Sequence, residues 1–350
     1  MATSSTTLRE AWAAFRAENP GVRSRSAAQQ LGVSEAELIA SGCGETVTRL
    51  KPDWEGILFD LESLGEVMAL TRNEAFVHEK VGRYRNVEMV PSHQMAMVLD
   101  EGVDLRIGLR HWRLAFAVVE NAPDRVKRSF HVYDQSGTAV HKVHLRPSSN
   151  VAAFDALAAR YRHDDQSPHQ AVTPLPAPPP ERPDHEVDGA GLRQKWSELK
   201  DTHDFVFLLR AFNVTRPQAL RLAAPEMAVE VTTDSFRRVM DAVAVAEMPI
   251  MVFVSSRGCT QIHIGPVRKL KVVGPWFNVL DPGFNLHVRD HLIDAAWVVR
   301  KPTRDGIVTS LELFGDDGSV LAYLFSKRKE GQLENAAWRD LLEALPHVEG

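Results

Sequence analysis

Polar and apolar residues alternate along several short segments in each half of the chain. An alternation with a period of two places successive side chains on opposite faces of a β-strand. The alternating segments are 105–109, 114–118, 129–133 and 139–145 in the first half, and 296–299, 310–314 and 319–325 in the second. A short polar run that ends in glycine, Asp134–Gly137, separates two of them and is typical of a hairpin turn. Both halves are therefore expected to contain an antiparallel sheet.

Residues 196–220 follow a helical period instead, and we expect two helices there. Thr202 and Thr215 are the predicted N-caps, because a threonine hydroxyl can accept a hydrogen bond from a free N–H group of the first turn. Thr215 and Gln218 also have the spacing of a capping box. The helices expected to close the two halves lie at 150–161 and 333–345.

The first of these two helices has two different apolar faces. With a rotation of about 100° per residue, one stripe should face the core. This stripe consists of Phe205, Leu208, Leu209 and Phe212. The opposite face carries His203, Val206, Phe207 and Arg210. A flat, apolar, anionic ligand would suit this second face, although His203 can equally be an ordinary polar residue of a first helical turn.

The two halves of the chain carry the same pattern twice. Leu31–Ser34 matches Phe212–Thr215, and Asp134–Gly137 matches Gly315–Gly318 at the same separation. A fixed separation between matching segments indicates an internal duplication. Because each copy begins with helices and continues with strands, the predicted fold class is α+β, with two pseudo-symmetric halves rather than a wound parallel sheet.

A proline-rich stretch separates the two copies. Residues 164–191 are rich in proline and poor in large apolar side chains, which predicts a semi-extended linker. The expected organisation is therefore a first repeat at 1–163, this linker, and a second repeat at 192–350 that carries His203.

Composition and charge narrow the possible functions. The net charge of −5 and the isoelectric point near 6.3 argue against a protein that gathers nucleic acid or anionic lipid. Only Cys43 and Cys259 are present, too few for a disulfide framework or a cysteine metal site, which fits a reducing compartment. The start of the chain lacks a signal-peptide pattern, and nowhere do about 18 apolar residues run together. We expect a cytoplasmic protein with no membrane insertion.

One motif favours a different class of function. Ala27–Leu38 has the pattern of a helix-turn-helix, with Ser34 and Glu37 as a capping box. Its second helix is acidic and has no lysine or arginine, so DNA phosphates would repel it. A DNA-binding regulator is therefore a remote alternative, and the turn is interpreted as part of the scaffold. The common phosphate-loop, Ser-His-Asp and HExxH patterns do not occur in the sequence.

The stretch around His203 resembles a known family. The residues that carry this likeness are Trp196, His203, Phe205 and Arg216. Their pattern is similar to that of the HemS/ChuS/PhuS family of cytoplasmic haem-utilisation proteins, also called hemin-degrading factors. The likeness covers nearly the whole chain and includes Asp104–Arg106, His111–Arg113, Phe284–His287, Arg300–Pro302 and Lys327–Gly331. In this family two repeats each carry a broad antiparallel sheet with helices.

The resemblance implies a site for one haem b. The residues that it suggests for this site are His203, Arg106, Arg216, Lys301, Arg328, Tyr323, Phe207 and Arg210. His203 would be the axial ligand of the iron, because neutral imidazole binds haem iron strongly. The segment around His203 aligns with Asn19–Gly21 of the first repeat, so the imidazole occurs in one copy only, which favours a single site.

The other implied residues have roles that suit their charges. Arginine can hold a carboxylate through two N–H groups and lysine acts as a point charge, so Arg216, Lys301 and Arg328 would bind the haem propionates. Tyr323 would lie near a propionate. Arg106, from the first repeat, would lie on the distal side of the haem, where it is the candidate catalytic residue.

The resemblance leaves two functions open. The protein would act in bacterial haem uptake and iron acquisition, either by degrading haem with an external electron donor or by carrying haem to a separate haem oxygenase. A haem importer and a haem oxygenase are the implied partners, and the expected state is a monomer or weak homodimer. The residues do not decide between enzyme and carrier.

Overall fold

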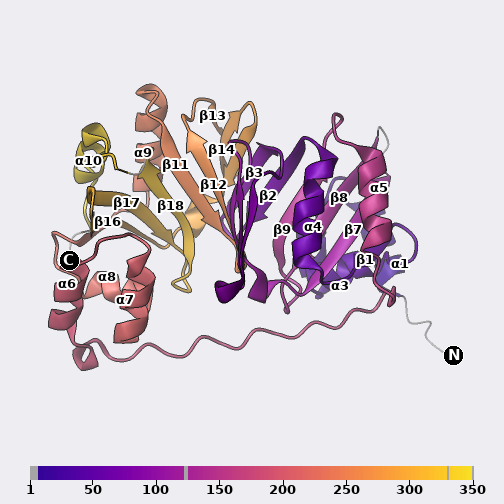
Figure 1. Ribbon diagram of the computed structural model, residues 1–350, viewed down its shortest axis with the longest axis horizontal. Helices are drawn as coiled ribbons and strands as arrows, with labels where there is room; N and C mark the ends of the chain where they lie inside the picture. Colours follow the sequence, from indigo (N-terminus) through magenta and orange to yellow (C-terminus); the bar gives the residue numbers. More distant parts are fainter. Residues whose placement is uncertain (1–6, 122–124, 329–330, 349–350) are drawn as a thin grey trace. The chain divides into compact units, whose positions relative to one another are not determined.

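The computed structural model describes residues 7–121, 125–328 and 331–348 (Figure 1). The chain divides into two compact units. Unit 1 consists of Met1–Arg72, Glu79–Pro176 and Ser256–Gln261, and unit 2 of Asn73–His78, Ala177–Ser255 and Ile262–Gly350. Each unit therefore contains most of one sequence half together with a short segment of the other.

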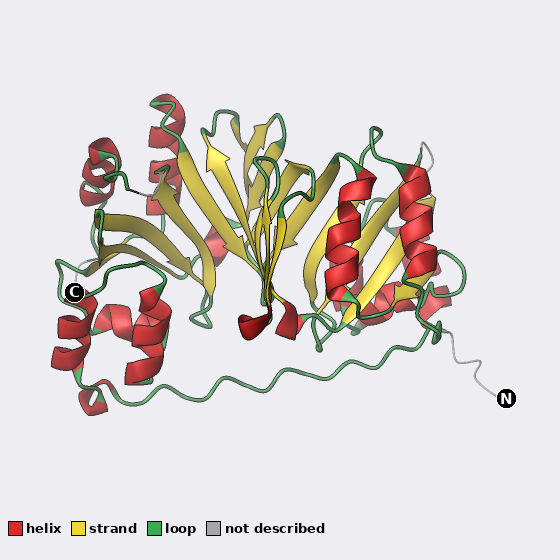
Figure 2. Ribbon diagram, viewed as in Figure 1, coloured by secondary structure: helices red, strands yellow, loops and turns green. Residues whose placement is uncertain are grey.

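Unit 1 combines antiparallel strands with short helices (Figure 2). Its helices are α1 (Leu8–Glu18), α2 (Ser24–Leu31), α3 (Glu35–Ala40), α4 (Trp54–Asp60) and α5 (Val151–Arg160). Its strands run in the order β1 (Val47–Leu50), β7 (Leu114–Asn121), β8 (Val126–Tyr133), β9 (Ala139–Leu145), β2 (Val67–Arg72) and β3 (Phe76–Gly82), with a further run β6 (Asp104–Gly108), β5 (Met95–Leu99) and β4 (Val87–Val90).

Unit 2 repeats this arrangement. Its helices are α6 (Gly189–Ser197), α7 (Asp204–Phe212), α8 (Arg216–Arg221), α9 (Ser235–Val245) and α10 (Ala336–Glu343). Its strands run in the order β10 (Ala228–Val231), β16 (Ala295–Thr303), β17 (Gly306–Phe314), β18 (Val320–Ser326), β11 (Ile250–Ser255) and β12 (Cys259–Gly265), with a further run β15 (Phe284–Val288), β14 (Trp276–Asp281) and β13 (Leu270–Val273). The same strand order in both units confirms the predicted duplicated α+β fold.

The hairpin predicted at Asp134–Gly137 joins β8 and β9, and its counterpart joins β17 and β18. Gly137 and Gly318 both have a positive φ, +77° and +72°, which a glycine adopts without a steric penalty. The pairing of β8 with β9 shifts register between Val132 and Tyr133. The pairing of β17 with β18 shifts at the equivalent place, between Leu313 and Phe314. The two copies therefore share the turn and also the β-bulge that precedes it.

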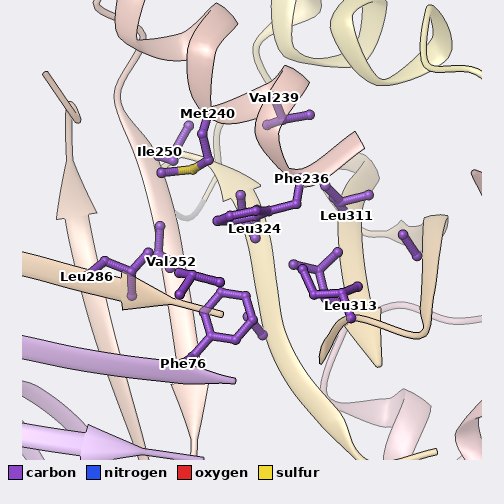
Figure 3. Close-up of a cluster of buried hydrophobic side chains, with 14 of the residues drawn as sticks. Phe76, Phe236, Val239, Met240, Ile250, Val252, Leu286, Leu311, Leu313 and Leu324 are labelled. Atoms are coloured by element: carbon purple, nitrogen blue, oxygen red, sulfur yellow. The ribbon is translucent and has the colours of Figure 1, made fainter. Parts of the chain in front are cut away.

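The core of unit 2 forms where α9 covers the sheet (Figure 3). Phe236, Val239, Met240 and Val243 recur at helical spacing, so one stripe of α9 is buried. It packs against inward-facing residues of the strands, among them Val252, Leu311, Leu313 and Leu324. A separate buried cluster joins α6, α7 and α8 to the neighbouring strands, and Trp196 in it donates a hydrogen bond to the carbonyl of Arg300 at 2.9 Å.

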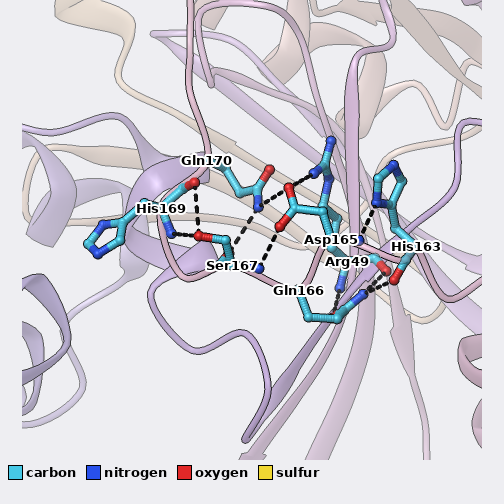
Figure 4. Close-up of polar contacts among 7 residues, drawn as sticks. All are labelled: Arg49, His163, Asp165, Gln166, Ser167, His169 and Gln170. Carbon is cyan, nitrogen blue, oxygen red and sulfur yellow. Dashed lines mark hydrogen bonds and ion pairs between the residues drawn. The ribbon is translucent and has the colours of Figure 1, made fainter.

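The first part of the predicted linker is bound to unit 1 (Figure 4). The side chain of Gln166 bonds both the N–H and the carbonyl of Arg49 on β1, at 3.0 and 2.9 Å. Asp165 forms an ion pair with the Arg49 guanidinium at 2.5 Å, and Gln170 donates to the carbonyl of Ser167 at 2.9 Å. These contacts hold the start of the linker against β1, and the segment Glu79–Pro176 of unit 1 includes it.

The helix-turn-helix segment is part of the scaffold. The predicted capping box between Ser34 and Glu37 is present. However, α3 buries five of its six residues, and the carboxylate of Glu35 binds Lys142 on β9 at 2.6 Å. A helix whose faces are packed against protein cannot enter a DNA groove. Among the helices of the described residues, none has both the length and the apolar character needed to cross a membrane.

Candidate functional site

His203 lies at the start of α7. The helix begins at Asp204, and His203 is its N-cap residue, with φ −71° and ψ −24° and no side-chain capping bond. The helix thus begins one residue later than the predicted N-cap Thr202 implies. The side chain of His203 is 91% exposed. An imidazole in this position is accessible to a ligand.

Asp201 holds one side of the His203 ring. Its Oδ1 accepts a hydrogen bond from the backbone N–H of His203 at 2.8 Å and one from ring Nδ1 at 2.7 Å. A carboxylate has no proton to donate, so Nδ1 carries the proton and Nε2 of the neutral ring carries the lone pair. The backbone hydrogen bond from His203 lowers the pKa of Asp201, as do the bond from the ring and the charge of Arg328.

The outer face of α7 is apolar, as the helical period predicted. Val206 and Phe207 are 45% and 59% exposed, whereas Phe205 and Leu208 on the other side are buried. The guanidinium carbon of Arg210 lies 6.0 Å from the centroid of the Phe207 ring. His203, Phe207 and Arg210 thus present a lone pair, an aromatic surface and a positive charge on one helix.

Arg216 begins α8 and is bound to a buried carboxylate. Thr215 is the N-cap and accepts from the N–H of Gln218, as predicted, but the Gln218 amide donates to the Arg182 carbonyl and to Asp184 instead of completing a capping box. Nε and Nη2 of Arg216 donate to the two oxygens of Glu312 on β17, at 2.6 and 2.7 Å. This is a two-point contact with a side chain that is not among the predicted site residues.

Lys301 on β16 binds the same carboxylate. Its Nζ lies 2.6 Å from Oε1 of Glu312, and the Ser310 hydroxyl donates to that oxygen at 3.1 Å. The Lys301 side chain is 3% exposed and that of Glu312 is fully buried. Burial would raise the pKa of Glu312, but the charges of Arg216 and Lys301 outweigh it and lower this pKa to about 2. Burial, opposed by Glu312, lowers the pKa of Lys301 to about 8.

Phe205 connects this buried cluster to the helix that carries the histidine. Its ring centroid lies 4.8 Å from the Arg216 guanidinium carbon and 4.9 Å from Nζ of Lys301. The ring of Tyr323 on β18 lies 4.9 Å from the same guanidinium carbon. At neutral pH two cations face one carboxylate, so the cluster has one net positive charge beneath α7.

The remaining predicted residues lie in different surroundings. Arg328 is half-buried and follows β18, close enough to Asp201 to lower its pKa. Lys329 and Glu330 of the motif Lys327–Gly331 lie outside the described residues. Arg106 belongs to unit 1, where β6 carries it and its guanidinium pairs with Asp104 on the same strand.

Three functional candidates were missed from the sequence: Asp201, Glu312 and Ser310. Asp201 had a local signal, since an aspartate two residues before another residue often accepts its N–H in a turn. The local sequence signal at Glu312 was misleading. Its place in the alternating segment 310–314 indicates only an ordinary strand residue.

A family model described as "Haemin-degrading HemS.ChuX domain" matches the chain twice, at residues 32–161 and 213–345. The two matches fall on the two copies of the duplicated fold. The chain belongs to this family. The fold and the family that the sequence suggested are thereby both confirmed.

Named relatives and solved structures agree with this assignment. The chain is 38% identical over 330 residues to the hemin transport protein HmuS of Yersinia pestis, covering 94% of each. A crystal structure of holo-PhuS, a heme-binding protein from Pseudomonas aeruginosa, superposes with a TM-score of 0.95 at 45% identity, covering 97% of this chain and 99% of that one. The heme degrading enzyme ChuS of Escherichia coli O157:H7 gives 0.88 at 34% identity, covering 97% and 98%.

Proposed function

We propose that this chain binds one haem b on unit 2, with Nε2 of His203 as the axial ligand of the iron. The observation that carries this proposal is the exposed imidazole whose Nδ1 is bound to Asp201, leaving the Nε2 lone pair for a ligand. Haem iron arrives already held by its macrocycle, so one protein ligand is enough. This suits the chain, because no three His, Cys, Asp or Glu side chains group into a metal site among the described residues.

The neighbouring side chains suit the rest of the haem molecule. The exposed Val206 and Phe207 offer an apolar surface to a porphyrin ring. We assign the two propionates to the cations of this unit, namely Arg210, Arg216, Lys301 and Arg328, with Tyr323 beside them. Arg216 and Lys301 are bound to Glu312, so they act mainly through the net positive charge of their cluster.

The biological role that follows is haem uptake and iron acquisition. Relatives described as hemin transport and heme-binding proteins support this role. We place the chain in the cytoplasm, where its buried free cysteines, Cys43 and Cys259, would stay reduced. A haem importer and a haem oxygenase are the proposed partners, and a monomer or weak homodimer is the proposed state.

A spectrophotometric haem titration tests the ligand assignment. We expect the wild type to give a Soret band that saturates at one equivalent, and His203→Ala to lose or shift it. His185→Ala is the matched control, since His185 is also an exposed histidine of unit 2. Equal binding by wild type and His203→Ala would assign the iron to another residue. Arg106→Ala in the same titration tests the predicted distal arginine.

A second function rests on the relatives described as a heme degrading enzyme and a heme oxygenase. Treating the ferric haem complex with ascorbate distinguishes a haem-degrading enzyme from a haem carrier. Conversion to a free open tetrapyrrole in the presence of catalase indicates an enzyme. Absence of conversion, or bleaching that catalase abolishes, indicates a carrier that hands haem to a separate oxygenase.

A further inference from the structure

Asp201 and His203 form a pair that is built into one turn of the backbone. One carboxylate oxygen accepts from both the N–H and the ring of the same residue, so the bond that shapes the turn also orients the imidazole. A histidine that ligates a metal is commonly held in this way, because a bond at the far nitrogen fixes the tautomer and makes the ligating nitrogen more basic.

We infer that Asp201 is a positioning residue for the haem iron, acting through Nδ1 of His203. This inference rests on the proposed function of His203. Asp201 selects the tautomer in which Nδ1 carries the proton and Nε2 is free to bind, and it keeps the ring in place before the ligand arrives.

The exposure of the pair separates this role from a purely structural one. The side chains of Asp201 and His203 are 59% and 91% exposed, so in the haem-free protein water screens their attraction and the pair contributes little to stability. A bound porphyrin would cover the ring and remove water from this bond. A hydrogen bond to a charged group becomes stronger in a medium of lower dielectric. The effect of the bond between Asp201 and the ring should therefore appear in ligand binding more than in folding.

The first test needs no haem. Long-range proton–nitrogen correlation spectra of the haem-free protein, with His203→Ala to assign the ring, report which nitrogen of the neutral imidazole is protonated. We expect the proton on Nδ1 in the wild type and on Nε2 in Asp201→Ala, since a free imidazole side chain prefers the latter. A wild-type ring protonated on Nε2 would overturn the inference.

The second test uses haem. Asp201→Ala and Asp201→Asn should raise the haem dissociation constant by about 10-fold to 100-fold, and they should lower the iron–histidine stretching frequency of the ferrous complex. Asp204→Asn is the matched control: it removes the same charge three residues away and should change neither quantity appreciably. The thermal midpoint of haem-free Asp201→Asn should match the wild type, because asparagine keeps an oxygen for the N–H of His203, and Asp201→Ala should lower it only modestly.

Failure of the positioning role of Asp201 can be told apart from failure of the proposed ligand role of His203. If both Asp201 variants match Asp204→Asn in affinity and in stretching frequency while His203→Ala abolishes the Soret band, the positioning role is wrong and the ligand assignment stands. If His203→Ala binds haem as the wild type does, the proposed function fails at this residue, whatever the tautomer spectra show.

Discussion

Arg216, the first residue of α8, and Glu312, near the end of β17, form a buried two-point ion pair with N–O distances of 2.6 and 2.7 Å. Lys301 adds a second cation to the same carboxylate. Removing one partner of a buried ion pair destabilises a protein, because it leaves a buried charge without compensation. Glu312 is therefore the counter-charge that keeps Arg216 and Lys301 compensated beneath α7.

Removing the Glu312 charge should destabilise unit 2. Glu312→Gln keeps the shape but leaves Arg216 and Lys301 buried without a counter-ion, which typically costs about 3–5 kcal/mol. Chemical denaturation at pH 7 measures the free energy of unfolding. Glu198→Gln is the control, because it removes only an exposed pair with Lys195, which water screens, and should change the free energy of unfolding little. A loss for Glu312→Gln as small as that of the control would show that the cluster does not hold its charges as described.

The pKa of Lys301 predicts a dependence of stability on pH. It falls from 10.5 to about 8 in the folded protein, so between these values the unfolded chain binds more protons than the folded one. Stability contributed by this group therefore rises with pH in that window, by up to about 1.4 kcal/mol per pH unit. Comparing the wild type with Lys301→Met at pH 8 and pH 9.5 isolates the effect. The wild type should gain about 2 kcal/mol relative to the variant, and an unchanged difference would contradict the lowered pKa.

At acid pH the same cluster predicts the opposite trend through Glu312. Its pKa is lowered from 4.5 to about 2, so the stability that it contributes is fully present above pH 4.5 and is lost as the pH falls through 2. In denaturation measured from pH 5 to pH 2, the advantage of the wild type over Glu312→Gln should shrink steadily. An advantage that stayed constant down to pH 2 would contradict the lowered pKa, because a constant difference requires the same pKa of Glu312 in the folded and unfolded protein.

The sequence revealed features set by local periodicity and missed those set by distant contacts. The two faces of α7 follow from side chains three and four residues apart, and the hairpin at Asp134–Gly137 follows from its own turn residues. The bond between Arg216 and Glu312 joins positions far apart in the chain, and no local pattern contains it. The structure begins α7 one residue later than predicted, and Asp201 accepts the N–H of His203 in the turn before it.

Phe207 offers a test of the apolar face. Because its ring is 59% exposed, Phe207→Ala should leave the thermal midpoint of the haem-free protein nearly unchanged. If the porphyrin packs on this ring, haem affinity should fall by about tenfold, the equivalent of about 1.4 kcal/mol. Phe59→Ala is the control, since Phe59 is a similarly exposed phenylalanine of unit 1. Equal haem affinities of the two variants would show that the porphyrin does not pack against Phe207 on α7.

Arg328 can be tested with a ligand that lacks the propionate charges. Its half-buried guanidinium follows β18 and acts electrostatically on Asp201, so it lies near the start of α7. Arg328→Ala should weaken the binding of haem, because a charge-assisted hydrogen bond to a carboxylate is lost, but should weaken the binding of haem dimethyl ester much less. Arg304→Ala controls for the loss of one cation from unit 2. If Arg328→Ala weakens the binding of both ligands equally, Arg328 does not bind a propionate and acts instead through Asp201 and the ligating histidine.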